Sequence, residues 1–202
     1  MAFTYTESVF ADPPEDCLAE GLQDLIVGNS LIFTEISAER DIDLPTIGAD
    51  QIFVGNVNKD SPKLLVISPE SISTPETGTQ LESVALRCVL RSGKEGTPSL
   101  QLNRSAAYTR AIRRLVVAVS RFPIESNGLH PLLLSWPAQA DGESAGDYLK
   151  RQRKYHKQID IELVSIQSLP SNEAARSADG GYEGGLLITY NLRSGVRKKN
   201  IS

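Results

Sequence analysis

The feature that most constrains the fold is residues 81–123, where a strand pattern is followed by a helix pattern. Between Val84 and Arg91 apolar side chains alternate with other residues, which is the pattern of a strand with one covered face. After a linker, a helix is predicted from Ser105, its N-cap, to Pro123. A strand and a helix that each carry an apolar face stabilise each other by covering those faces, so this pair is expected to form the core. The apolar stripe of the helix consists of Tyr108, Ile112, Leu115, Val116 and Val119.

A second amphipathic helix is predicted near the start of the chain. Asp12 and Pro13 are a typical helix start, with the aspartate as the cap and the proline in the first turn. Leucine and isoleucine then recur at helical spacing, and Gly28 and Asn29 supply the C-cap. Residues 31–36 have the composition of a short strand but would equally extend the helix, so both interpretations stand.

Several other segments have the composition of strands. Residues 51–56 and 63–68 are expected to form a hairpin, because the five residues between positions 57 and 63 favour a turn. A late strand at 186–192 is expected to pair either with its own sheet or with the exposed edge of a neighbouring subunit. Further strands are predicted at 129–136 and 159–163, and loops at 38–50, 69–80, 138–149 and 168–185.

These elements predict an α/β (α+β) fold in which a mostly antiparallel or mixed sheet packs against two helices. Residues 1–167 are expected to form a single domain. Residues 168–202 are expected to form a loop, a C-terminal strand and a basic tail that engage neighbouring subunits.

Charge is divided unevenly along the chain. Residues 1–86 carry 15 acidic and 3 basic side chains, a balance of −12, whereas residues 87–202 carry 10 acidic and 18 basic ones, a balance of +8. Either these charges solvate two surfaces, or the acidic side of one subunit faces the basic side of the next, in a head-to-tail contact that closes into a ring. The interface candidates on the acidic side are Asp41 and Asp43, and those on the non-core side of the long helix are Arg110, Arg113, Arg114 and Arg121.

A second group of interface candidates is a basic run that precedes the strand at 159–163. It is interpreted as a loop that is solvated or faces another subunit. The alternative is binding to nucleic acid, since basic side chains neutralise phosphates and the interleaved tyrosines can stack on bases. The members of the run are Lys150, Arg151, Arg153, Lys154 and Lys157.

Residue types that carry catalysis are scarce. His130 and His156 are the only histidines, and the sequence contains no CxxC, HExxH, DxDxDG, GxxxxGKS or GxGxxG pattern in the required context. Cys17 and Cys88 fall on predicted buried faces, which is typical of thiols in a reducing compartment. No apolar run approaches the roughly 20 residues that span a membrane. The sequence therefore predicts no catalytic residue, cofactor, metal or membrane contact, and an enzyme would need an unrecognised carboxylate site with a raised pKa.

The order of predicted elements resembles that of the tail terminator, or tail completion, proteins of tailed bacteriophages. The resemblance covers about residues 12–167 and rests on the strands LESVALRCVLRSG and QIDIELVSIQ and on the proline-containing loop before KLLVISPE. It implies a small α/β subunit of a hexameric ring in the virion neck, assembled in the host cytoplasm. The implied partners are further copies of the chain, the tail tube or sheath protein and the head connector, with DNA in passing. Residues 168–202 have no counterpart, which leaves a head completion or connector role open.

Overall fold

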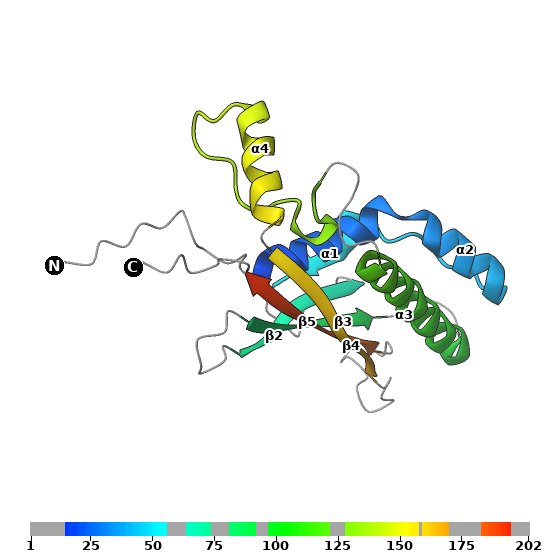
Figure 1. The fold of residues 1–202 in the computed structure, drawn as a ribbon. Coiled ribbons are helices and arrows are strands. Elements are labelled where there is room, and N and C mark those ends of the chain that lie inside the picture. The colour runs from blue at the N-terminus through cyan, green and yellow to red at the C-terminus, as the bar shows by residue number, and fades with distance from the viewer. Residues whose placement is uncertain are drawn as a thin grey trace.

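The computed structural model describes residues 15–55, 64–73, 81–91, 97–121, 128–157, 159–169 and 183–194. Within them the chain forms an α+β fold, a five-stranded mixed sheet packed against helices, as the sequence predicted (Figure 1). The helices are α1 (Glu15–Gly28), α2 (Leu31–Arg40), α3 (Pro98–Arg121) and α4 (Ala145–His156), with short 3-10 helices η1 (Ala49–Gln51) and η2 (Pro131–Leu133). The strands are β1 (Ile52–Val54), β2 (Leu65–Ser73), β3 (Leu81–Arg91), β4 (Ile159–Leu169) and β5 (Glu183–Ser194).

The sheet has the strand order β1-β2-β3-β5-β4, and every described pair except β1–β2 is antiparallel. The predicted strand at 186–192 is part of β5, which pairs within its own sheet between β3 and β4. The predicted alternation in β3 is confirmed, because the side chains of Val84, Leu86, Cys88 and Leu90 are buried.

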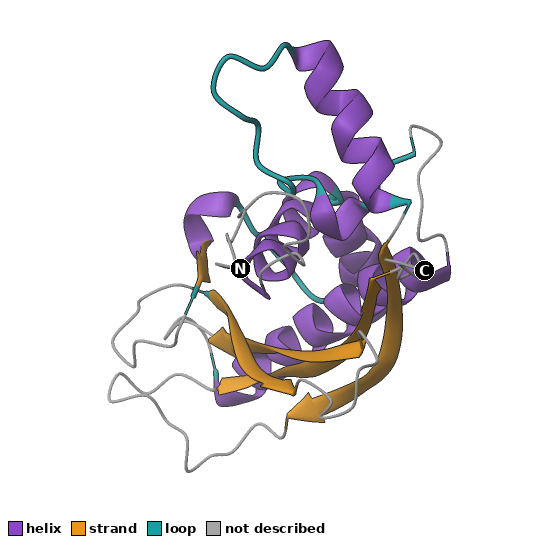
Figure 2. Cartoon of the chain, turned by 60° about the vertical axis from the view of Figure 1, so that its left-hand side comes forward, coloured by secondary structure: helices purple, strands orange, loops and turns teal. Residues whose placement is uncertain are grey.

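Two helices, α1 and α3, pack against the sheet and form the core with it, and the strands curve beneath the helices (Figure 2). The predicted apolar stripe of α3 is confirmed, since Ile112 and Val116 are fully covered. Helix α1 ends at Gly28 as predicted, and the Asn29 side chain caps it by donating to the Leu25 carbonyl at 2.8 Å.

One predicted helix boundary and one strand interpretation are wrong. Helix α3 begins at Pro98 rather than at Ser105, because Thr97 is the N-cap and accepts a hydrogen bond from the Leu100 amide at 3.3 Å. The strand interpretation of residues 31–36 is also wrong, because this segment lies in the separate helix α2. Phe33 and Ile36 are both buried, and a spacing of three puts side chains on one face of a helix but on opposite faces of a strand.

The predicted hairpin is wrong as well. Strand β1 runs parallel to β2, with Ile52 opposite Leu65, so the chain does not reverse between them by a tight turn. The residues on which the turn prediction rested lie outside the described part. All four predicted loops are shorter than expected, because α2 continues to Arg40, β2 to Ser73 and β4 to Leu169, and because α4 begins at Ala145.

The strand predicted at 129–136 is replaced by η2 and the turns around it. The His130 side chain caps η2 by accepting from the Leu132 amide at 3.1 Å, which favours a helical turn over an extended chain. Helix α1 packs directly on this turn. A Cβ at Gly21 would lie 2.1 Å from the Leu132 carbonyl oxygen, so the contact requires glycine there.

The basic run forms the helix α4 and is not a loop, and α4 stands away from the sheet (Figures 1 and 2). The Ser144 hydroxyl accepts a hydrogen bond from the Asp147 amide at 3.2 Å and caps the helix. Asp147 lies in the first turn and basic side chains fill the last turn, which suits the helix dipole. Capping and charge placement therefore favour a helix in spite of its low apolar content.

Candidate functional site

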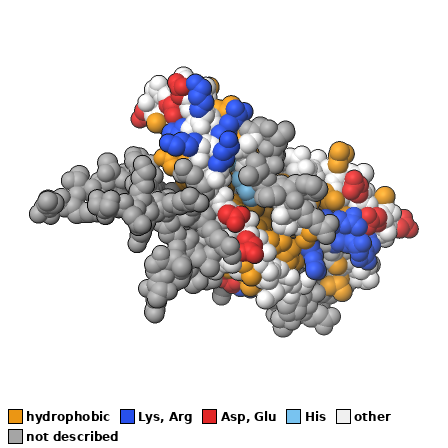
Figure 3. Space-filling view, viewed as in Figure 1, with side chains coloured by type: hydrophobic (Ala, Val, Ile, Leu, Met, Phe, Trp, Pro, Cys, Tyr) orange, Lys and Arg blue, Asp and Glu red, His pale blue; other side chains and the backbone are white. Residues whose placement is uncertain are grey.

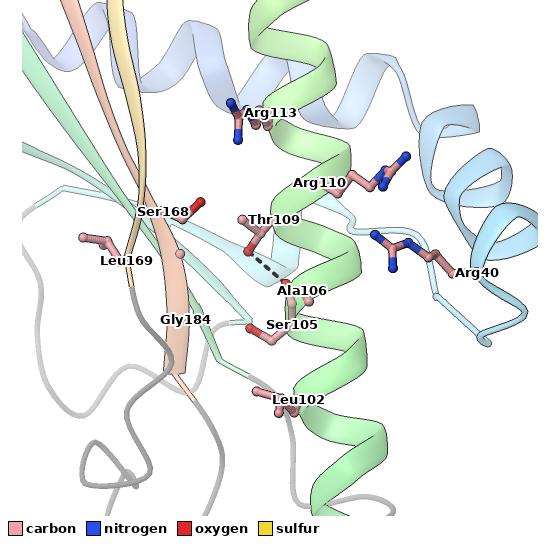
Figure 4. A pocket seen from close by; sticks show the side chains of 11 residues that line it. Arg40, Leu102, Ser105, Ala106, Thr109, Arg110, Arg113, Ser168, Leu169 and Gly184 are labelled. Carbon is pink, nitrogen blue, oxygen red and sulfur yellow. Dashed lines mark hydrogen bonds between the residues drawn. The ribbon is translucent and has the colours of Figure 1, made fainter.

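A hollow with a volume of about 360 Å³ lies beside α3 (Figure 4). Its floor is a second stripe of α3, separate from the core stripe, on which Leu102, Ala106 and Thr109 recur at helical spacing. The ends of β4 and β5 bound it on one side, and Arg40 of α2 lies on the other.

Cationic side chains surround one end of this hollow. Arg113 projects on the side of the strands, whereas Arg110 and Arg40 lie on the side of α2 (Figure 4). Arg113 makes no ion pair with any residue that the structure describes. The nearest acidic partner, Glu39, is 3.5 Å from Arg110 but is bound more closely by Arg114, at 2.6 and 2.9 Å.

These pairs join the acidic and basic parts of the chain within one molecule. The hydrogen bond from Arg114 holds the pKa of Glu39 below its usual value, with further attraction from Arg110 and Arg40. Further along α3, Arg104 binds the Asp43 carboxylate at 2.8 Å. Three of the predicted interface residues, Arg110, Arg114 and Asp43, are therefore engaged inside the subunit.

The loop after α2 begins at a residue with left-handed backbone and is tied to α3 by a further hydrogen bond. Asp41 has a left-handed backbone (φ 51°) and caps α2, and its side chain is exposed. The Tyr108 hydroxyl donates to the Pro45 carbonyl at 2.7 Å, and burial raises its pKa to about 12. Arg121 is the last residue of α3, and its side chain lies outside the described part of the structure.

The basic residues of the run lie on two different faces of α4. Four of its cations follow a spacing of i, i+3, i+4 and i+7, which places them on one face of the helix, and all four side chains are exposed (Figure 3). Among them only one has a described ion pair, a 3.3 Å contact between Lys150 and Asp147. We call this surface the α4 stripe, and it consists of Lys150, Arg153, Lys154 and Lys157.

Arg151 belongs to the other face of α4 and has a structural role. It makes two hydrogen bonds to the Glu143 carboxylate, at 2.8 and 2.7 Å, and one to the Ala138 carbonyl at 2.8 Å. The hydrogen bond from Arg151 lowers the pKa of Glu143 to about 2. This arginine was predicted to face a partner, but the folded chain uses it to hold the loop before α4.

Two buried polar side chains fasten α4 to the segment around η2. The Gln152 amide donates to the Leu134 carbonyl at 2.6 Å. The His156 Nδ1 accepts from the His130 backbone amide at 2.9 Å, so its proton lies on Nε2 and is donated to the Trp136 carbonyl at 2.7 Å. We call Gln152 and His156, with these three partners, the α4 anchor.

Burial, with repulsion from His156, lowers the pKa of His130 to about 4. Burial likewise lowers the pKa of His156. Both imidazoles are therefore neutral at pH 7, and both make structural hydrogen bonds. Cys88 is packed in the core, and burial raises the pKa of its thiol to about 12. Among the described residues no three His, Cys, Asp or Glu side chains gather to hold a metal, and no helix is long and apolar enough to cross a membrane.

The outer edge of the sheet is the third candidate surface. Strand β4 is one of the two edge strands, the other being β1, and among the described residues no strand pairs with the outer side of β4. The sheet register slips at Val164, whose side chain is 52% exposed. Near the start of the strand, Asp160 and Glu162 are exposed.

Comparison with known protein families, with curated proteins and with solved structures gives no match. Functional interpretation therefore rests on the residues and geometry of this chain.

The sequence identified the cationic residues but not how they are grouped. It predicted Arg110 and Arg113 on one side of a helix, and the structure places both at the hollow. It did not predict that Arg40, from a segment predicted to be a loop, would join them. The spacing of the α4 stripe was a usable signal, but it was not applied because the run was interpreted as a loop.

Proposed function

We propose that the chain is a structural subunit that assembles with copies of itself into a ring of the tail terminator kind, at the neck of a tailed bacteriophage. The observation that supports this best is the outer edge of β4, a strand of 11 residues with which no strand pairs on that side in the described part of the chain. An edge of this length presents backbone donors and acceptors that a neighbouring chain can pair with. The ring would close the tail tube and join it to the head connector.

The edge of β4 is suited to a controlled contact. Free strand edges promote unrestricted pairing unless charges or bulges interrupt them. The irregularity at Val164 and the exposed carboxylates of Asp160 and Glu162 break this edge into two parts. One defined neighbour can then pair with it, whereas indefinite stacking is disfavoured. A head-to-tail contact of this kind closes into a ring when the rotation between subunits is suitable.

The proposal is tested by electron microscopy and light scattering of the purified chain, alone and mixed with a tail-tube protein. Rings, free or at the ends of tubes, are the expected result. Val164→Lys puts a charge on the open edge and is expected to abolish them, whereas Val164→Thr keeps the shape and is expected to retain them. A chain that stays monomeric and leaves tube ends bare would contradict the proposal. Rings that bind the head connector but not the tube would instead support a head completion role.

The α4 stripe favours a second candidate function, which is binding to nucleic acid. Its four exposed cations lie on one face of a projecting helix, as expected for contact with phosphates. Replacing all four by alanine is expected to abolish duplex DNA binding in a fluorescence anisotropy titration at low salt, while Arg40→Ala with Arg113→Ala serves as the control for lost charge. Arg151 is left unchanged because it is structural. DNA binding that persists without the stripe would remove this candidate.

A further inference from the structure

The hollow beside α3 is lined largely by small residues, so an extended backbone can fit into it. Its floor is made of small side chains, with Ala106 exposed and Thr109 turned to its own helix, where the hydroxyl donates to the Ser105 carbonyl at 2.9 Å. The opposite wall includes the backbone of Gly184–Gly185, but the bare position at Gly185 faces β3, since a Cβ there would lie 1.9 Å from the Cys88 carbonyl oxygen. The small side chains of α3 are therefore what lets a backbone approach this helix closely. Leu102, which is 42% exposed, gives the hollow one apolar end.

The other end of the hollow carries more positive than negative charge. Arg40, Arg110 and Arg113 line it, and Arg114 lies one residue beyond. Against these four cations stand Glu39, whose two oxygens are both bound by Arg114, and Glu35, which attracts Arg114. An incoming carboxylate would find guanidinium groups that have no full partner, and guanidinium binds carboxylate with two parallel hydrogen bonds.

The hollow also adjoins the open edge of β4. Ser168, near the end of that strand, directs its side chain toward α3 (Figure 4). An extended segment that paired with this edge would place every second side chain over α3. Such a segment would need small or apolar side chains near Leu102 and carboxylates near Arg113.

The chain itself supplies acidic segments, because residues 1–86 carry a net charge of −12. We infer that the hollow is the acceptor half of a contact between copies, and that it binds a carboxylate-bearing segment from residues 1–86 of a second copy. This inference rests on the proposed function and adds to it which surfaces meet. The contact is heterologous, since the acceptor and donor surfaces differ.

The test places a photo-crosslinking residue at Ala106 and, as a matched control, at Ala118. Both alanines are exposed on α3, and twelve residues of helix turn the control away by about 120°. The labelled chain is mixed with an unlabelled copy, irradiated and analysed by mass spectrometry. The expected result is a crosslinked dimer from position 106, joined within residues 1–86 of the second copy, with little product from position 118.

Arg113→Glu in the labelled copy is expected to reduce this product by about tenfold, while Arg113→Lys retains most of it. Unchanged circular dichroism would show that both variants are folded. A product that joins residues 87–202, or that Arg113→Glu leaves unchanged, would overturn the inference. Rings that form without any product from position 106 would overturn it while the proposed function stands. A chain that forms neither product nor ring would contradict both.

Discussion

Helices α3 and α4 carry the two cationic surfaces of the molecule, but they are attached to it in opposite ways. Helix α3 buries apolar side chains such as Ile112 and Val116 against the sheet, whereas the two buried side chains of α4 are Gln152 and His156. Apolar burial is non-directional and spread over many contacts, while a buried polar group contributes only if each hydrogen bond is kept. The orientation of α4 therefore depends on a few specific bonds.

The two helices also differ in how their charges are used. On α3 most cations are matched within the chain, as Arg104 is by Asp43 and Arg114 by Glu39. On α4 the stripe is exposed, and a single described ion pair, between Lys150 and Asp147, touches it. The number of basic residues on α3 therefore overstates the positive charge that is available to bind a partner. The cations without an ion pair inside the subunit are the ones to test.

The largest expected effect tests the apolar attachment of α3. Ile112→Ala removes a fully buried side chain and is expected to lower the free energy of unfolding by about 2 to 5 kcal/mol, because it leaves a cavity. Denaturant titration measures this change. Arg113→Ala on the exposed face is the control, with an expected change within about 0.5 kcal/mol. Equal effects from the two variants would show that packing does not hold α3.

Acid tests the segment to which α4 is anchored, because the His130 side chain caps η2 by accepting from the Leu132 amide. The pKa of His130 lies at about 4 in the fold and at 6.5 ordinarily, so between these values the unfolded chain binds more protons. Stability is complete above pH 6.5 and falls as the pH drops toward 4, by about 3 kcal/mol. Unfolding measured across this range checks the loss. His130→Gln, which cannot titrate, is expected to flatten the curve, and a curve of unchanged slope would contradict the assignment.

Gln152→Leu removes the side-chain amide from the α4 anchor, and with it the hydrogen bond to Leu134 and the longer contacts with Trp136 and Tyr148. The leucine has a similar size but leaves the Leu134 carbonyl without its donor, at a cost of about 1 to 3 kcal/mol. Hydrogen exchange is expected to quicken in α4 while α3 is unchanged. Lys154→Leu on the exposed face serves as the control. Uniform quickening across both helices would mean that α4 is not a separate unit.

Tyr190→Phe removes a buried polar group that has no hydrogen-bond partner in the described structure, whereas Gln152→Leu removes one that is hydrogen-bonded. Its expected effect is the smallest. The Tyr190 hydroxyl is buried in the core without a hydrogen-bond partner in the described structure, and burial raises its pKa. Removing it is expected to leave stability unchanged or raise it by up to about 1 kcal/mol, in contrast to the loss at Gln152. Thermal unfolding measures the difference. A clear destabilisation would indicate that this hydroxyl has a partner after all.

Much of the fold could be predicted from the sequence because it depends on local periodicity. The alternation in β3 and the stripe of α3 each bury one face, and any arrangement that covers those faces satisfies the pattern. The C-cap of α1 at Gly28 is likewise local. These elements could be predicted because interactions between residues a few positions apart determine them.

The remaining features depended on contacts between distant segments. Nothing local distinguishes a parallel from an antiparallel partner for β1, and only the sheet decides it. Helix α4 has few apolar side chains, so its pattern was weak, and the α4 anchor draws on residues from positions 130 to 156. The sequence by itself determined the core elements and the supply of charge. The tertiary structure decided which charges neutralise each other and which remain exposed, because ion pairing depends on distance in space rather than on position along the chain.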